Sequence, residues 1–399
     1  MLGALRYMGR GWTFDDLEEG TQIGEDKHRT FFHTFIKVGA TKMYDKWVKQ
    51  PCTDAEIDDC LSEFREAGMD GSCFSTDATH VQHEKCDSKL KNAHLGGKMP
   101  CTARSYNISV NHRREILATA PGCPGRWNDK TVSTFDRFLC DVRQGKLYED
   151  VTYDLYDSKG TLHTFRGVWG LADNGYLKWS CLMPPVKDAV FEDDLRWSKW
   201  LESMRKDVEC TFGILKGRWR ILKVGIRLHS ISDVDRVWKT CCALHNFLLH
   251  SDGLNIRWKK ARRRAGQSDY EGELGLHDLV DSQRLHVTGD YDTSGMRLAE
   301  AEIEDEERGE DFHEVWDDEI VDAEAGGGLE DINVVAIANA PLANVTDIRN
   351  LGFDEFRKIL IAHFNYRFRH MNDIKWPSRT GEGRPLQWWS ERHSNNDTC

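Results

Sequence analysis

The sequence lacks the features of a membrane or secreted protein. No apolar run among its 399 residues is long enough to span a bilayer. The first residues, MLGALRYMGRGW, lack the apolar core and the cleavage site of a secretory signal. The 12 cysteines form no CxxC pair and no regular spacing, which argues against a zinc ribbon or a disulfide framework. We therefore expect free thiols, no membrane partner, and a cytoplasmic or nuclear protein.

The sequence also lacks an excess of positive charge, since its net charge is −12. Over the whole chain this value argues against a nucleic-acid partner, because phosphates attract a basic protein. The charge is unevenly placed, however. Residues 302–330 are densely acidic, whereas residues 205–227 and 257–264 are strongly basic. Charge therefore has to be judged by segment, and the average is misleading here.

The N-terminal segment, residues 1–68, is predicted to be helical. Gly9 and Gly11 end a first short helix, Thr13 is a plausible N-cap for a second, and residues 25–48 carry apolar side chains at helical spacing. Short helices joined by Gly-containing turns are compatible with a helix-turn-helix. A small helical bundle with no DNA role fits the spacing equally well.

The rest of the chain is predicted to form an α/β (α+β mixed) domain and a tail. Within residues 69–250, strands are expected at 72–80 and 167–172, with a hairpin over 105–120, an insertion at 141–166 and helices over 191–250. The remaining segments are a basic stretch at 251–265, an acidic and mostly disordered linker at 266–345, and a C-terminal helix at 346–375.

Two aspartates stand out by their local sequence. Asp77 lies in an otherwise neutral strand, CFSTDATHV, where an edge position facing solvent is the plainer interpretation. Asp129 follows a turn rich in Pro and Gly, PGCPGRWND, where it could cap the next helix. Both residues could instead serve as metal ligands, because Mg²⁺ and Mn²⁺ prefer converging carboxylates.

Glu209 is the most informative acid. Arg205, Glu209 and Lys216 fall on one face of a predicted helix, beside an apolar stripe. A carboxylate flanked by cations suits a metal ligand that faces a phosphate, although a solvated i,i+4 ion pair is the plainer alternative.

Four separated motifs together resemble PIF/Harbinger-type DDE superfamily transposases. STDATHV resembles the strand of the first Asp, usually D-G-T-H, with Ala78 in place of Gly. The segment RSYNISVNHRREILATAPGCPGRWNDKT resembles the region of the second Asp. LADNGY resembles the D-x-G-Y element and points to Asp173. RKDVECTFGILKGRWRIL followed by DVDRVWKTCCALHNFLLH resembles the end of the catalytic domain. The resemblance covers roughly residues 1–250 and, less distinctly, the C-terminal helix.

This resemblance implies an RNase H-like DDE core, with the first Asp on the first strand, the second on a later strand and the Glu on a helix. The implied catalytic and metal-binding residues are Asp77, Asp129 and Glu209. Asp173 is either a competitor of Glu209 or a fourth metal ligand, and because it sits in a turn it could instead be a structural cap. Two Mg²⁺ or Mn²⁺ ions would support cutting of DNA phosphodiesters at transposon ends. A nuclear location, a Myb-like accessory protein and a homo-oligomer are further expectations. The alternative is an inactive or repurposed descendant that binds DNA or a protein.

The basic residues have two interpretations. Arg205, Lys216, Arg218 and Arg220 could clamp phosphates or form a solvated helix face, and we favour the clamp. Arg262, Arg263 and Arg264 could form a nuclear-localisation signal or contact the DNA backbone. By the same resemblance, Glu25–Lys37 would be a recognition helix. The acidic segment 302–330 could shield the basic face, although a solvating linker is the plainer interpretation.

A last cluster follows Asp77 in the sequence. His80, His83 and Cys86 lie close together, but a zinc site would need a fourth ligand, and no convincing one stands at a suitable spacing.

Overall fold

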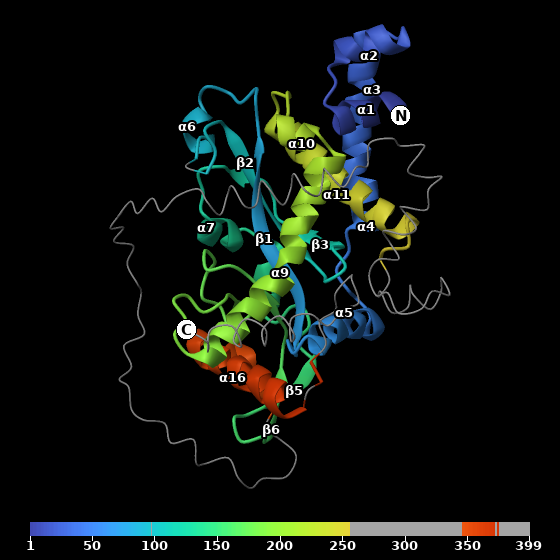
Figure 1. The fold of residues 1–399 in the computed structure, drawn as a ribbon. Coiled ribbons are helices and arrows are strands. Elements are labelled where there is room, and N and C mark those ends of the chain that lie inside the picture. The colour runs from blue at the N-terminus through green and yellow to red at the C-terminus, as the bar shows by residue number, and fades with distance from the viewer. Residues whose placement is uncertain (97, 256–344, 372, 375–399) are drawn as a thin grey trace, which may run out of the picture.

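The computed structural model describes residues 1–96, 98–255, 345–371 and 373–374 (Figure 1). The predictions for Arg262, Arg263, Arg264 and the acidic segment 302–330 lie outside the described residues, as does nearly all of the predicted linker.

A mixed sheet forms the centre of the molecule. Its strand order is β3-β2-β1-β7-β8, and β4 also pairs with β2. Strand β2 runs antiparallel to β1 and β3, whereas β7 is parallel to both β1 and β8. The strands are β1 (Ser72–Gln82), β2 (Ala103–Val110), β3 (Ile116–Thr119), β4 (Cys123–Pro124), β7 (Trp169–Leu171) and β8 (Leu182–Met183).

The central position of β1 corrects two expectations. Because β1 is paired on both sides, Asp77 does not lie on an edge strand. The alternation of buried and exposed residues that is typical of a half-buried strand is also absent at its start, where five consecutive residues from Ser72 to Thr76 are all buried. Both faces of the sheet are covered, so polarity along β1 does not follow a two-residue period.

Helices cover the two faces of the sheet. Long helix α9 (Glu192–Arg218), short α10 (Ile221–Val224) and α11 (Ile231–Ser251) share a core with residues of β1, β2 and β3 on one face. The other face packs against α5 (Asp54–Glu66) and α8 (Arg137–Arg143). The apolar residues at helical spacing on α9 and α11 are buried in this core. On α11 the last of them, Leu248, is only partly covered.

The N-terminal helices pack on α10 and α11 (Figure 1). Thr13 caps the second helix through a capping box, as predicted. The first helix runs through Gly9 and ends at Gly11, whose φ of 68° is left-handed. The helices are α1 (Leu2–Arg10), α2 (Phe14–Thr21) and α3 (Glu25–Val38), and α3 continues through a π-helical turn (Gly39–Met43) into α4 (Tyr44–Trp47).

The predicted insertion pairs with the C-terminal segment. Strands β5 (Thr152–Tyr156) and β6 (Leu162–Arg166) form a hairpin, and β9 (Thr346–Asp347) runs parallel to β6. A 3₁₀ turn (Ile348–Asn350) leads to α16 (Phe353–Tyr366), which ends in a π-helical turn (Arg367–Met371) and packs on α9 and β5. Asp70, just before β1, accepts hydrogen bonds from His363 and Arg367 and so fixes the C-terminal helix to the core.

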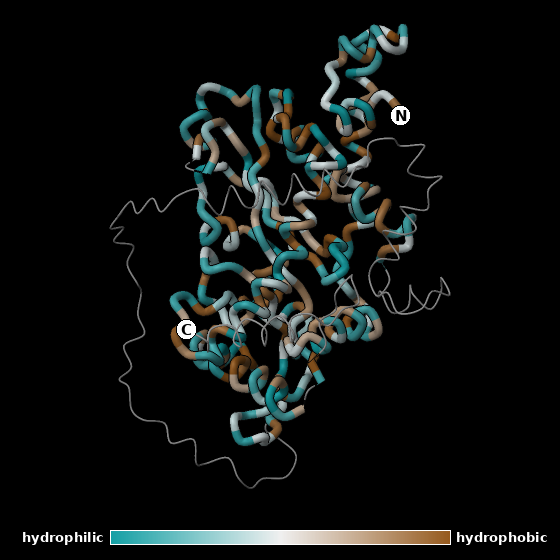
Figure 2. The backbone as a smooth tube through the Cα atoms, viewed as in Figure 1, coloured by the Kyte–Doolittle hydropathy of each residue, from teal (hydrophilic) through white to brown (hydrophobic). Residues whose placement is uncertain are grey.

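Two short helices complete the described elements, α6 (Lys91–His94) and α7 (Asp129–Thr134). Hydrophobic and hydrophilic residues alternate along most helices in Figure 2, as expected where one helix face is buried. In the described parts of the chain every cysteine is a free thiol. None of the helices described is both long and apolar enough to span a bilayer.

Candidate active site

The structure brings the four predicted acids together on the α9 face of the sheet. Asp77 comes from the middle of β1, Asp129 from the first turn of α7, and Glu209 from α9, elements that adjoin in Figure 1. Asp173 follows directly after β7. Asp77 is close enough to Asp173 and Glu209 for their charges to raise its pKa, and Asp129 acts in the same way on Asp173. Four segments far apart in the chain therefore meet at one site.

Arg205 lies between two of these acids. One guanidinium nitrogen is 2.9 Å from Oδ2 of Asp77, and another is 2.7 Å from Oε1 of Glu209. Only 16% of the Arg205 side chain is exposed, so the guanidinium faces the acids rather than solvent. The sequence predicts a phosphate contact for Arg205. In this structure its guanidinium instead forms ion pairs with Asp77 and Glu209.

Asp129 is not the helix cap that its position suggested. The N-cap of α7 is Asn128, whose side chain accepts a hydrogen bond from the amide of Thr131. Asp129 is the first residue of the helix, not part of a later strand as the resemblance implied. Its Oδ2 accepts from Nζ of Lys98 at 2.9 Å, while Oδ1 is buried with no hydrogen-bond partner among the described residues. The carboxylate therefore has one acceptor that remains unsatisfied.

Gly175 explains how Asp129 and Asp173 come close. A Cβ at this position would lie 3.0 Å from Oδ2 of Asp129 and 3.1 Å from Oδ1 of Asp173. The Gly175 amide donates to that same Asp173 oxygen at 2.8 Å. The glycine thus leaves room for both carboxylates and holds one of them in place.

The crowding of negative charge changes the protonation of the site. Burial raises the pKa of Asp77 to about 7, against the opposing effect of Arg205, and the charges of Asp173 and Glu209 raise it further. Burial and Asp129 likewise raise the pKa of Asp173. Burial alone would lower the pKa of Lys98, but Asp129 and the neighbouring acids raise it overall. A bound cation would relieve the part of these shifts that comes from repulsion between the acids.

A neutral network supports the site from the other face of the sheet. The hydroxyl of Tyr176 donates to Oδ1 of Asn107, whose amide nitrogen donates to Thr76 at 3.0 Å and to Asp136 at 2.6 Å. Thr76 and Tyr176 each lie within three residues of a site acid, so this buried network fixes the backbone on which the acids stand.

The remaining predicted residues lie at the end of α9 and in the turn that follows it. Lys216 and Arg218 are partly exposed and Arg220 is exposed. Trp219, which interrupts the basic run, is buried in the core of the N-terminal helices. Two residues near the acids were not predicted: Lys98 and His80. His80 has one ring nitrogen 3.2 Å from the Gly125 carbonyl oxygen, and burial and Lys98 lower its pKa. No sequence pattern marks Lys98, because its contact with Asp129 joins a loop to a helix.

The metal-binding potential of the acids rests on their oxygens. The donor set is oxygen only, as Mg²⁺ and Mn²⁺ require, and the unsatisfied Oδ1 of Asp129 fits a cation. The acids are not drawn into one tight group: among the described residues, only His83, Cys86 and His94 have ligand atoms that all lie within 4.8 Å of one another. Arg205 forms ion pairs with Asp77 and Glu209, and Lys98 forms one with Asp129.

Residues 76–246 match the family model of the DDE superfamily endonucleases. The matched segment begins one residue before Asp77 and includes all four acids. It supports a DDE transposase superfamily domain with an RNase H-like core, and a nuclease-type function with DNA as the substrate. DDE superfamily endonucleases generally use divalent metal ions. Comparison with curated proteins and with solved structures gave no significant match.

Proposed function

We propose that this protein is a metal-dependent DNA endonuclease of the transposase type, of PIF/Harbinger character, which cuts phosphodiesters at transposon ends. The observation that carries the proposal is the meeting of Asp77, Asp129, Asp173 and Glu209 on one face of the sheet, inside the segment that matches the DDE superfamily endonucleases. The motifs of the sequence supply the finer assignment to the Harbinger type.

In this proposal Asp77, Asp129 and Glu209 are the catalytic metal ligands, and Asp173 is a fourth ligand. Two Mg²⁺ or Mn²⁺ ions, when bound, would activate the attacking oxygen and stabilise negative charge on the phosphorus. The Oδ1 of Asp129 supports a cation here, because it is buried with no hydrogen-bond donor among the described residues. Burial raises the pKa of Asp77, and the charges of Asp173 and Glu209, which raise it further, are charges that a cation would offset.

Arg205 and Lys98, the two basic side chains beside the acids, also have a role in this proposal. Arg205 pairs with Asp77 and Glu209, and Lys98 pairs with Asp129, each at 2.9 Å or less. Where these carboxylates hold a metal, the same two cations would be available to the DNA phosphate. Arg suits this second role, because its planar guanidinium binds a phosphate through two parallel hydrogen bonds.

The DNA would extend from the acids along the second half of α9. Lys216 and Arg218 lie there, Arg220 lies just beyond at the start of α10, and all three would contact backbone phosphates. Helix α3 would act as the recognition helix, with Glu25–Lys37 as its contact region. Its polar side chains such as Lys27, Arg29 and Lys37 are exposed, which supports this role. Arg262, Arg263 and Arg264 would serve DNA binding or nuclear import, and the protein would act in the nucleus.

Two partners follow from the resemblance alone. A Myb-like protein would bring the nuclease to its DNA, and a second copy of the chain would be needed to cut both ends of one element. Both are proposals without a surface assigned to them.

Nicking of supercoiled plasmid DNA tests the proposal. We expect the parent protein to nick DNA with Mg²⁺ or Mn²⁺ and not with EDTA. Asp129→Asn should lower the rate by about 100-fold or more, since it removes a charge from the metal site. Asp58→Asn is the matched control: that side chain is 70% exposed on α5, which packs on the opposite face of the sheet, so its rate should not change.

A second candidate is a repurposed protein that binds DNA without cutting it. The position of Arg205 favours this candidate, because its guanidinium pairs with both Asp77 and Glu209 and would compete with a metal for them. If the parent binds DNA with the salt dependence of a phosphate contact, but neither it nor Asp129→Asn nicks DNA with either metal, the endonuclease proposal fails and this candidate stands.

A further inference from the structure

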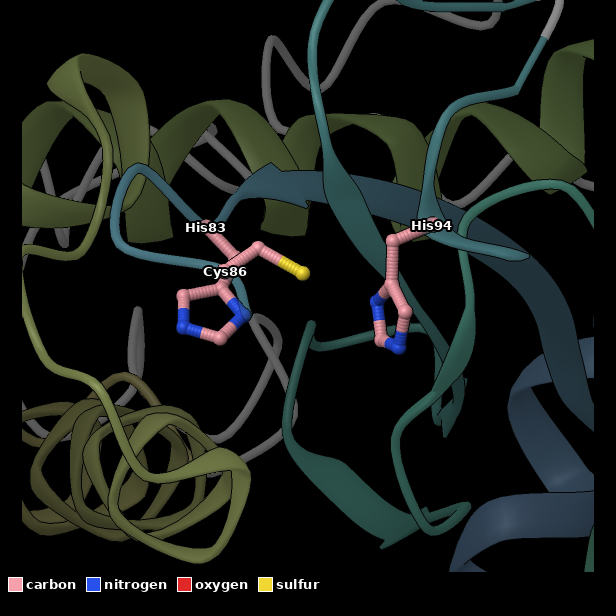
Figure 3. Close-up of side chains that lie close together, drawn as sticks. All are labelled: His83, Cys86 and His94. Carbon is pink, nitrogen blue, oxygen red and sulfur yellow. The ribbon is translucent and has the colours of Figure 1, made fainter. Parts of the chain in front are cut away.

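We propose a second metal site, for one Zn²⁺, formed by His83, Cys86 and His94 at the tip of the connection between β1 and β2. One ligand atom from each of these residues lies within 4.8 Å of the other two. In Figure 3 the sulfur of Cys86 lies between the two imidazole rings. Among the described residues no other group of His, Cys, Asp or Glu is as close.

The hydrogen bonds of the two histidines prepare them for a metal. Nε2 of His83 lies 2.8 Å from the Leu228 carbonyl oxygen, and Nδ1 of His94 lies 3.1 Å from the Ala103 carbonyl oxygen. A carbonyl oxygen can only accept, so each of these nitrogens carries the proton. The other nitrogen of each ring then has a free lone pair. A metal-bound histidine usually has this arrangement, with its second nitrogen donating to a carbonyl or carboxylate.

The unprotonated nitrogen of His83 is the strongest sign of a ligand. His83 is fully buried, and its Nδ1 has no hydrogen-bond partner among the described residues. A buried acceptor without a partner is unfavourable, and such a group calls for an explanation. A metal ion between His83 and the sulfur of Cys86 would supply the missing interaction.

The chemistry of the donors selects zinc. Two imidazoles and a thiolate are typical zinc ligands and are poor ligands for Mg²⁺. Zinc at the usual bond lengths of ~2.0 Å to nitrogen and ~2.3 Å to sulfur would draw the three atoms somewhat closer than they lie here. Cys86 is half-buried at the surface, so water can take the fourth position.

The site would stabilise a segment that reaches the carboxylates. His83 follows β1, His94 ends α6, and the loop after His94 carries Lys98 to Asp129. Zinc would tie both ends of the α6 segment together. The sequence indicated a different group, His80, His83 and Cys86. In the structure a ring nitrogen of His80 lies 3.2 Å from the Gly125 carbonyl oxygen, and His94 is the second histidine of the cluster instead.

Binding of a metal needs neutral histidines and an ionised thiol. Burial lowers the pKa of His83 and His94, which favours their neutral form. Burial and Asp87 raise the pKa of Cys86, so this thiol keeps its proton until a metal displaces it. Binding of Zn²⁺ would therefore form the S–Zn bond with loss of the S–H proton to solvent, and one proton would be released for each zinc bound.

Metal analysis of the full chain tests the site. We expect one zinc per chain after purification without added chelator. Cobalt substituted for zinc should give the strong absorption of a cobalt–thiolate bond. Cys86→Ser and His94→Gln should each lose the zinc and this absorption. Cys52→Ser, which removes an exposed cysteine outside the group, should keep both.

The test separates this site from the endonuclease proposal, because Asp129→Asn should abolish nicking and leave the zinc content unchanged. Circular dichroism of each variant checks that the fold is retained. Absence of zinc and of the cobalt–thiolate absorption in the folded parent would overturn the proposal. Retention of both in folded Cys86→Ser would overturn it as well.

Discussion

Two buried carboxylates on opposite faces of the same sheet behave differently. Asp136, on the α8 face, is 1% exposed, accepts from the amide of Leu139 and from the side chain of Asn107, and caps α8. Asp77, on the α9 face, keeps 18% of its side chain exposed, and faces an arginine and two other acids. Burial raises the pKa of both.

The difference shows that burial by itself does not indicate function. Asp136 is satisfied by neutral donors that belong to its own fold, so nothing further is needed there. The cluster around Asp77 contains repelling charges, two cations recruited from a loop and a helix, and an oxygen of Asp129 with no donor among the described residues. An unbalanced group of this kind marks a site for an external charge.

Removal of charge from the Asp77 cluster should have the largest effect. We expect Glu209→Gln to lower the metal-dependent nicking rate by about 100-fold or more, because the metal loses a charged ligand. The melting temperature should stay close to that of the parent. The control is Glu202→Gln, an exposed acid on the same helix. Equal loss of activity in the two variants would mean that the helix surface matters and the cluster does not.

The Asp136 network should show the opposite behaviour. Asp136→Ala removes an N-cap and one of the two acceptors of the Asn107 side chain, so we expect a loss of about 2–4 kcal/mol in the free energy of unfolding. Urea denaturation measures this value. Asn128→Ala, which removes the exposed cap of α7, should cost only about 1 kcal/mol. Similar losses of unfolding free energy in the two variants would show that the buried network of Asp136 adds no more stability than an exposed helix cap.

The pH dependence of stability sharpens the comparison at Asp77. Its pKa is about 7 in the folded state and 3.8 is the ordinary value, so between these two the folded protein holds a proton that the unfolded chain releases. This contribution to stability falls as pH rises from about 4 to about 7.

We therefore compare the free energy of unfolding of metal-free Asp77→Asn with that of the parent. We expect the stability of the variant relative to the parent to increase by about 1–3 kcal/mol as pH rises from 5 to 8. Thermal melts at both pH values measure this gain. With saturating Mg²⁺ the gain should vanish or reverse, because the ion stabilises the carboxylate. A difference that does not change with pH would contradict the assigned pKa of Asp77.

The smallest effect should come from Gly175. A Cβ there must displace the oxygens of Asp129 and Asp173 by a few tenths of an ångström. We expect Gly175→Ala to weaken Mg²⁺ binding by about two- to tenfold with little change in stability, since small misplacements of ligands cost affinity. Calorimetric titration measures the affinity, with Gly217→Ala as control, because a Cβ at that position meets no atom within 4 Å. Equal affinity in both variants would show that the glycine does not shape the site.

The sequence predicted the strands and helices that carry the acids, since apolar periodicity reflects which face each element buries. The Thr13 cap, the hairpin after Ser105 and the buried stripes of α9 and α11 all follow from local pattern. The exact position of Asp129 did not, because Asn128 and Asp129 are both good caps and only the backbone decides between them.

Contacts between distant segments could not be predicted in the same way. Lys98 reaches Asp129, Arg205 joins Asp77 to Glu209, and His94 approaches His83 only because the sheet order brings these segments together. Hydrophobic pattern places a residue on a face of its own element. It carries no information about which other element supplies the neighbouring charge.

The sequence by itself determined which acids are candidate metal ligands and which apolar faces the helices bury, because residue type and local period are written in the chain. The tertiary structure alone decided how their charges are balanced. Its sheet order sets which cation faces which carboxylate, and it also leaves a buried nitrogen of His83 without a hydrogen bond beside a thiol and a second imidazole. These are through-space effects, and they depend on packing rather than on sequence separation.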